Sequence, residues 1–243
     1  MFNKKSEPLV VAEHFIRQYF PNCLGAILAG SLVRGEGTST SDLDIVIFDE
    51  NVHSSYRESF FFEEWPVELF VHNMNSYKHF FELDCERAKP SLPKMIAEGL
   101  VIKGQGALTS IQEEARLLLS NGPSEWSKAT ITIKRYFLTD VLDDFIGCTN
   151  SQEELYVAHS LFDLASEFVL RTNRQWTGTS KWGYRALKQF DESFANKFTE
   201  AFDAYYKHGE KEKIVEIVEE VLQPYGGRLF EGFSLGKPSS DDH

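Results

Sequence analysis

Two aspartates in the first third of the chain have the type and spacing of metal ligands. Asp42 and Asp44 are one residue apart and lead into the apolar, β-branched residues 45–48, which predict a buried strand. Side chains two apart on a strand share a face, so both carboxylates point the same way and repel each other unless a cation lies between them. Mg²⁺ takes one or two carboxylates and completes its shell with water and phosphate oxygens. The pair therefore predicts a site for Mg²⁺ and a phosphorylated substrate.

A third carboxylate is expected from a neighbouring strand. Residues 67–71 form an apolar run interrupted only by Glu68. A charge inside such a run is costly unless it is paired or bound to a metal. Glu63 and Glu64 are the alternatives for this third acid, but they lie outside the apolar run. We expect Glu68 to complete the site, which would then hold two Mg²⁺ ions, with Mn²⁺ able to substitute.

The segment before the aspartates predicts a place for phosphate. Residues 24–29 read as a buried strand that ends in Gly30 and Ser31, and residues 31–36 can form one or two helical turns. Free N–H groups at a helix N-terminus attract phosphate, so Gly30 and Ser31 are the expected ligands. A polar loop follows and ends in Ser41, a further expected nucleotide contact. Arg34 either reaches the same phosphates or braces the loop, and the sequence favours neither role.

The complete pattern resembles a known signature. The sequence GSLVRGEGTSTSDLDIVI, with Glu68 downstream, resembles that of the nucleotidyltransferase superfamily of the DNA polymerase beta type: Gly-Ser, a spacer, Asp-x-Asp and a third acid on a later strand. Among its members, the chain is most similar to small bacterial kanamycin, streptomycin and lincosamide nucleotidyltransferases. The resemblance implies transfer of a nucleoside monophosphate, with ATP as the usual donor, to a hydroxyl of a small-molecule acceptor, with release of pyrophosphate.

The first part of the chain predicts an α/β domain over residues 1–106. Helical spacing of apolar residues, strand-length apolar runs and Gly or Pro breaks give the expected elements. They are a helix at 7–19, strands at 24–29 and 45–48, a hairpin of 59–62 with 67–71 whose turn lies near 63–66, a helix at 75–88, and a helix or strand at 90–102. We expect a small mixed sheet.

Long amphipathic patterns replace the strands in the second part. They predict an all-α helical bundle domain over residues 107–233, followed by a disordered tail at 234–243. Its expected helices are 109–120, 124–145, 151–172, 179–190, 191–207 and 210–222.

A basic stretch within this bundle suggests a second contact with the nucleotide. Residues 171–188 carry five Lys or Arg residues and no acid, in a chain of formal net charge −12. Lys181 is expected in the first turn of a helix, where the helix dipole disfavours a cation. A phosphate bound by Lys181 and Arg185 would neutralise the local positive charge and offset the unfavourable helix dipole at Lys181. The alternative is a solvated basic face that pairs with acids such as Glu167 and Asp191.

The predicted helix 151–172 also carries a polar stripe that includes Asp163 and Glu167. Such a stripe is usually only the wet face of a helix. It could instead line the acceptor pocket and supply a general base. The resemblance implies that the base comes from the helical domain, but it does not choose between the two residues.

Composition excludes several classes of protein. The net charge of −12 argues against general binding to nucleic-acid backbones, and therefore against a template-dependent polymerase. Cys23, Cys85 and Cys148 are far apart, as expected for free thiols in a reducing compartment. No apolar window reaches the roughly 18 residues of a membrane span. We expect a cytoplasmic protein without a membrane partner.

Two other functions remain open. One is a protein-modifying antitoxin of the minimal nucleotidyltransferase kind, which the additional helical domain disfavours because such proteins are typically a single short domain. The other is a nucleotide sensor without catalytic activity, which the presence of acids at positions 42, 44 and 68 disfavours.

Overall fold

The chain folds as two compact units. The computed structural model describes residues 6–237, and the first unit ends at Gly122 while the second begins at Pro123. All the strands among the described residues lie in the first unit, and the second consists of helices and connecting segments. The predicted α/β domain followed by an all-α bundle is thereby confirmed.

The first unit is built on a five-stranded mixed sheet. Its strands are β1 (Gly25–Ala29), β2 (Leu43–Phe48), β3 (Tyr56–Phe62), β4 (Trp65–His72) and β5 (Leu100–Lys103), in the order β3-β4-β2-β1-β5. β2 and β4 run parallel, and the other neighbouring pairs are antiparallel. β1 is buried along its whole length and β2 along nearly all of it, as their apolar runs require.

A tight turn sets the register between β3 and β4. Glu63 and Glu64 connect the two strands and both have positive φ, 47° and 67°. Two successive residues of this kind form the turn whose twist matches that of a hairpin. The turn pairs Phe62 with Trp65 and, further along the strands, Ser59 with Glu68. The predicted hairpin is therefore confirmed, and its register determines which side chains of β3 lie beside Glu68.

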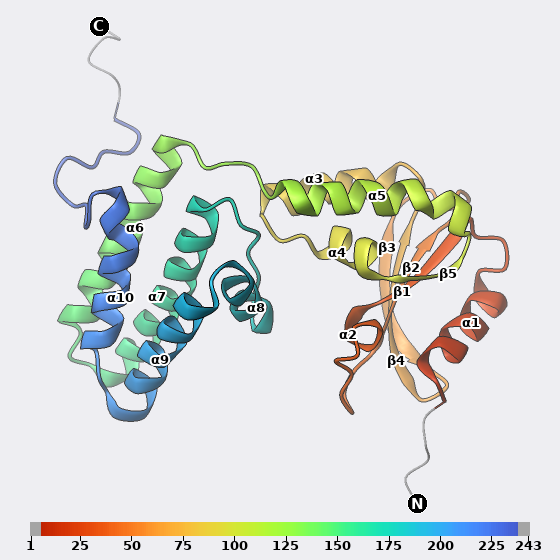
Figure 1. The fold of residues 1–243 in the computed structure, drawn as a ribbon, viewed down its shortest axis with the longest axis horizontal. Coiled ribbons are helices and arrows are strands. Elements are labelled where there is room, and N and C mark those ends of the chain that lie inside the picture. The colour runs from red at the N-terminus through yellow and green to blue at the C-terminus, as the bar shows by residue number, and fades with distance from the viewer. Residues whose placement is uncertain (1–5, 238–243) are drawn as a thin grey trace, which may run out of the picture. The chain divides into compact units, whose positions relative to one another are not determined.

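Helices cover both faces of the sheet, as Figure 1 shows for α1 (Pro8–Tyr19) on one side and for α3 (Ser76–Glu86) and α5 (Gln105–Asn121) on the other. Phe15 and Ile16 of α1 pack in one core, with side chains such as Ile45 and Leu69. The opposite core contains residues from α3, α4 (Ser91–Glu98) and α5, together with side chains of β1 and β2. Residues 90–102, for which the sequence allowed a helix or a strand, form both α4 and β5.

The boundary between the units differs from the predicted one at residues 106 and 107. The helix expected at 109–120 is α5, and it belongs to the first unit. Leu108, Ile111 and Ala115 are fully buried in the core beside α3 and α4. An amphipathic helix has the same sequence pattern whichever core it covers, so only packing could assign it. The chain leaves α5 at Gly122, where φ is +73°.

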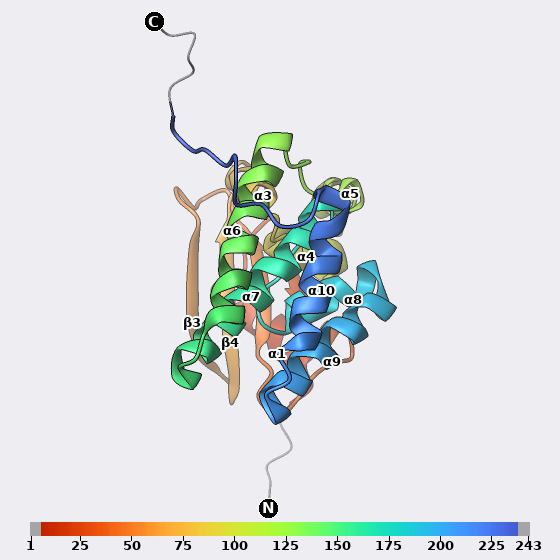
Figure 2. The same cartoon turned by 90° about the vertical axis from the view of Figure 1, so that its left-hand side faces the viewer.

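The second unit is a bundle of α6 (Lys128–Gly147), α7 (Ser151–Thr172), α8 (Lys181–Phe190), α9 (Glu192–His208) and α10 (Glu212–Leu222). Figure 2 shows α6, α7 and α10 side by side, and all three contribute to one apolar core. Phe145, Phe168 and Phe198 are its largest fully buried side chains. Residues 234–237 of the predicted tail form no helix or strand, and residues 238–243 lie outside the described part.

The three cysteines form no disulfide: Cys23, Cys85 and Cys148 are free thiols, as their spacing predicts. No helix within residues 6–237 is long and apolar enough to cross a membrane.

Because α5 packs in the first unit, replacing its buried leucine should destabilise that unit, and replacing its exposed leucine should not. Leu108→Ala should lower the free energy of unfolding by about 2–5 kcal/mol, because it leaves a cavity against the sheet. Leu117→Ala in the same helix is the control, because Leu117 is 62% exposed. Hydrogen exchange of the β1 and β2 amides measures both effects. Faster exchange confined to α6–α10 in Leu108→Ala would contradict the assignment.

Candidate active site

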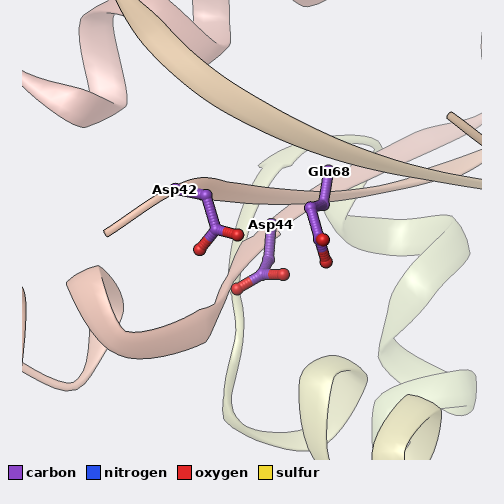
Figure 3. Close-up of side chains that lie close together, drawn as sticks. All are labelled: Asp42, Asp44 and Glu68. Atoms are coloured by element: carbon purple, nitrogen blue, oxygen red, sulfur yellow. The ribbon is translucent and has the colours of Figure 1, made fainter. Parts of the chain in front are cut away.

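The three carboxylates predicted from the sequence lie together. One oxygen each from Asp42, Asp44 and Glu68 can be chosen so that all three lie within 4.8 Å of one another. Asp42 directly precedes β2, Asp44 is in β2, and the parallel pairing with β4 sets Glu68 directly beside Asp44. Figure 3 shows the three side chains projecting from the two strands into the same space. The alternatives Glu63 and Glu64 form the hairpin turn instead.

The electrostatics of this cluster are unfavourable without a cation. The pKa of Asp44 is raised from 3.8 to about 6, first by burial and then by the negative charges of Asp42 and Glu68. Arg34 and Arg57 act in the opposite direction on the pKa of Asp44 without cancelling the rise. Hard carboxylate oxygens in this arrangement suit a divalent cation. The cluster could therefore hold a divalent metal ion.

Gly30 leaves the space beside Asp44 open. It begins the short helix α2 (Gly30–Val33), directly after β1, with a φ of +82°. A Cβ on Gly30 would lie 1.9 Å from Oδ2 of Asp44. Any other residue would therefore collide with the carboxylate and strain the backbone. Two features therefore require glycine at this position: the positive φ of the turn and the close approach of the Asp44 carboxylate.

Ser41 has a structural role that the sequence did not reveal. Its buried hydroxyl accepts a hydrogen bond from the backbone N–H of Thr38 at 2.9 Å and lies 3.0 Å from the Ser31 hydroxyl. These contacts fasten the polar loop before β2 to the start of α2. Ser31 and Ser41 are therefore adjacent, although a nucleotide contact from either stays a prediction.

Arg34 forms the contacts of a brace. Its guanidinium pairs with Glu36 at 3.2 Å and with Glu98 of α4 at 3.5 Å. It also lies close enough to Asp44 to lower the pKa of that carboxyl. The bracing role of Arg34 is thus visible, and contact with phosphate stays a prediction.

Arg57 belongs to the site and was missed by the sequence analysis. Its guanidinium lies 2.7 Å from Oε1 of Glu68. The signal lay in the hairpin: with Glu63 and Glu64 in the turn, Arg57 pairs with Phe70 and is diagonal to Glu68. Long side chains reach across such a diagonal. Because the exact turn was unknown, the sequence left this register undetermined.

The basic stretch in the second unit divides into different environments. Arg171 is buried and donates to the carbonyl of Ser124 at 2.8 Å, so it is part of the bundle core. Lys188 pairs with Glu192 at 3.0 Å, and Arg185 lies over the ring of Trp182. Lys181 is exposed and is the first residue of α8, as predicted. The solvated-face alternative thus describes Lys188, while the roles of Lys181 and Arg185 stay predictions.

The two candidate bases lie on α7, and each is close to a basic side chain. Glu167 pairs with Lys134 of α6 at 2.6 Å. Asp163 is more exposed, at 69% of its side chain, and lies 3.9 Å from His159. A role as general base for either carboxylate stays a prediction.

Residues 12–101 match a family model described as "Nucleotidyltransferase domain". The match runs from α1 into β5 and contains Asp42, Asp44 and Glu68. A solved structure, a nucleotidyltransferase-like protein from Exiguobacterium sibiricum 255-15, is similar with a TM-score of 0.48 and 12% sequence identity, over 90% of this chain and 75% of that chain. No curated protein matches the chain.

The raised pKa of Asp44 predicts that Asp44→Asn stabilises the metal-free protein. Above about pH 6 Asp44 is ionised in the folded state, and its charge there lowers the free energy of unfolding. The size of the pKa shift limits this destabilisation to about 3 kcal/mol. The wild type should regain this stability as the pH falls from about 6 towards 4, because the folded state binds the proton more tightly than the unfolded state. Asn removes the cost at every pH. The advantage of Asp44→Asn should therefore be largest near neutral pH and vanish in acid.

Urea unfolding in a chelating buffer, repeated across this pH range, measures the difference. A variant less stable than the wild type at about pH 7.5 would show that repulsion and burial do not dominate at Asp44.

Proposed function

Residues 12–101 are a nucleotidyltransferase domain, and we propose that the chain uses it to transfer a nucleoside monophosphate, AMP from ATP, to a hydroxyl of a small-molecule acceptor, with release of pyrophosphate. The observation that carries the proposal is the convergence of Asp42, Asp44 and Glu68 beside the turn at Gly30 and Ser31. Two observations support the choice of a small-molecule acceptor: the sequence motif resembles that of antibiotic nucleotidyltransferases, and the acidic net charge disfavours a nucleic-acid template.

Asp42, Asp44 and Glu68 would hold Mg²⁺, two ions in all. The bound cations would polarise the phosphate being transferred and make the acceptor hydroxyl a better nucleophile. The fit rests on three hard oxygen donors and on the pKa of Asp44, raised in part by the neighbouring negative charges that a cation would neutralise. Gly30 keeps the approach to Asp44 free of side-chain atoms.

The chain's own polar groups would orient the triphosphate. Ser31 and the backbone at the start of α2 would contact the outgoing phosphates, and Ser41 would hold this turn in place through its hydrogen bonds. Arg34 would offset negative charge at the same end of the site, as its influence on Asp44 indicates.

The strand order suggests that the triphosphate and the acceptor would bind on opposite sides of β2. The phosphate turn follows β1, on one side of β2, while Glu68 lies on β4, on the other side. In phosphoryl transfer the attacking and leaving oxygens lie roughly in line, on opposite sides of phosphorus. The acceptor would therefore approach from the side of β4 and β3. Phe61 of β3, which is 79% exposed, is available there for contact with it.

The direct test is pyrophosphate release from Mg-ATP with a panel of aminoglycosides, lincosamides and candidate proteins. Asp42→Asn should lower the rate by about 10²- to 10⁴-fold, because loss of a metal ligand removes several kcal/mol of transition-state stabilisation. Glu82→Gln, which changes an acid of α3 whose side chain is 76% exposed, serves as the folded control. A rate in Asp42→Asn above half that of the wild type would end the proposal. Modification of a protein alone would favour the antitoxin function, and nucleotide binding without any transfer would favour the sensor.

Lys181→Ala tests whether the helical unit contacts the nucleotide. If Lys181 binds a phosphate, its loss should weaken Mg-ATP binding by about 1.5–3 kcal/mol, the usual contribution of a charge-assisted hydrogen bond. Stability without ligand should stay level or rise slightly, because a cation leaves the helix N-terminus. Lys188→Ala is the control in the same helix, since Lys188 pairs with Glu192. Equal dissociation constants by calorimetry for wild type and Lys181→Ala would remove Lys181 from the site.

A further inference from the structure

The third carboxylate of the triad is held by an arginine from the edge strand. Arg57 of β3 has a guanidinium nitrogen 2.7 Å from Oε1 of Glu68. The hairpin register pairs Ser59 with Glu68 and Arg57 with Phe70, so the ion pair spans a diagonal between the strands. Arg57 therefore lies on the same face of the sheet as Glu68 and Asp44.

A second contact restricts where the guanidinium can go. It lies over the ring of Phe70, 5.0 Å from the ring centroid. Phe70 is two residues after Glu68 on the same strand face, so the ring and the carboxylate together define the position of the guanidinium. A flexible arginine on an edge strand is thereby confined beside the triad.

The exposure of this pair indicates that fold stability is not its main effect. The Arg57 side chain is 58% exposed and that of Glu68 is 30% exposed. Ion pairs at such sites add little to the free energy of unfolding. Orientation of a carboxylate is a different effect, because a glutamate side chain has several rotamers and only some direct it towards Asp42 and Asp44.

We propose that Arg57 is a positioning residue: it binds one oxygen of Glu68 and so directs the other oxygen towards the cation held with Asp42 and Asp44. The inference rests on the proposed metal site and adds a residue that neither the motif nor the family match assigns. Partners of this kind, which bind a ligand rather than the metal, typically change metal affinity by about 10- to 100-fold when removed.

The sign of the effect distinguishes positioning from simple electrostatics. Arg57 is a cation beside a cation site, and its charge helps to lower the pKa of Asp44. If charge alone mattered, its removal would make the site more negative and tighten metal binding. Positioning predicts the opposite, weaker binding, because Glu68 loses its fixed orientation.

The experiment is titration of the metal-free full chain with Mn²⁺, in which free Mn²⁺ is followed by electron paramagnetic resonance. Arg57→Ala should raise the dissociation constant by about 10-fold or more, and Arg57→Lys, which keeps the charge but not the planar fork, should lie between it and the wild type. Arg17→Ala removes an exposed arginine of α1, on the other face of the sheet, and should match the wild type. Urea unfolding should be nearly unchanged in all three variants.

A double-mutant cycle tests whether Arg57 acts through Glu68. In a Glu68→Gln background, Arg57→Ala should change Mn²⁺ affinity by less than about 2-fold, because the carboxylate that it orients is absent. An undiminished effect in that background, or unchanged or tighter binding in Arg57→Ala alone, would overturn the role of Arg57. Asp44→Asn distinguishes failure of the metal site from failure of the role of Arg57. If Asp44→Asn and the wild type bind Mn²⁺ with equal affinity, or if neither binds Mn²⁺, the proposed metal site is wrong.

Discussion

Repulsion among three carboxylates on one sheet face is the constraint on which the site depends. Asp42, Asp44 and Glu68 are brought within reach of one another by the parallel pairing of β2 with β4. Burial and mutual repulsion raise the pKa of Asp44 to about 6, so the folded chain keeps a group whose charge it disfavours. A carboxyl whose pKa is strongly raised in this way is typical of functional sites, where charge is arranged for a ligand rather than for the stability of the fold.

The surroundings of the triad reduce this cost without removing it. Arg57 pairs with Glu68 from the edge strand, and Arg34 acts on Asp44 while it pairs with Glu36 and Glu98. Gly30, in turn, is required beside Asp44 because any Cβ would collide with the carboxylate. Arg57, Arg34 and Gly30, which lie on different elements, thus each contact or approach the same cluster of charge.

The helical unit has a different physical basis. Its helices are held by one apolar core, and most of the charged groups that the sequence singled out there have local partners: Glu167 with Lys134, Lys188 with Glu192, and Arg171 with the carbonyl of Ser124. These contacts explain why a cluster of charges in a sequence is weak support for a binding surface. Lys181, exposed at the start of α8, remains the residue with which a nucleotide contact can be tested.

The sequence by itself determined the order of elements from α1 to α3 and the identity of the triad, because strand-length apolar runs, a Gly-Ser turn and acids at fixed spacing are local signals. It could not assign α5 to the sheet, since amphipathic spacing does not name the core that a helix covers; the burial of Leu108 and Ile111 did. Nor could it find Arg57 or the bracing contacts of Arg34 with Glu98. These depend on strand register and helix packing, which join residues distant in the chain and exist only in the tertiary structure.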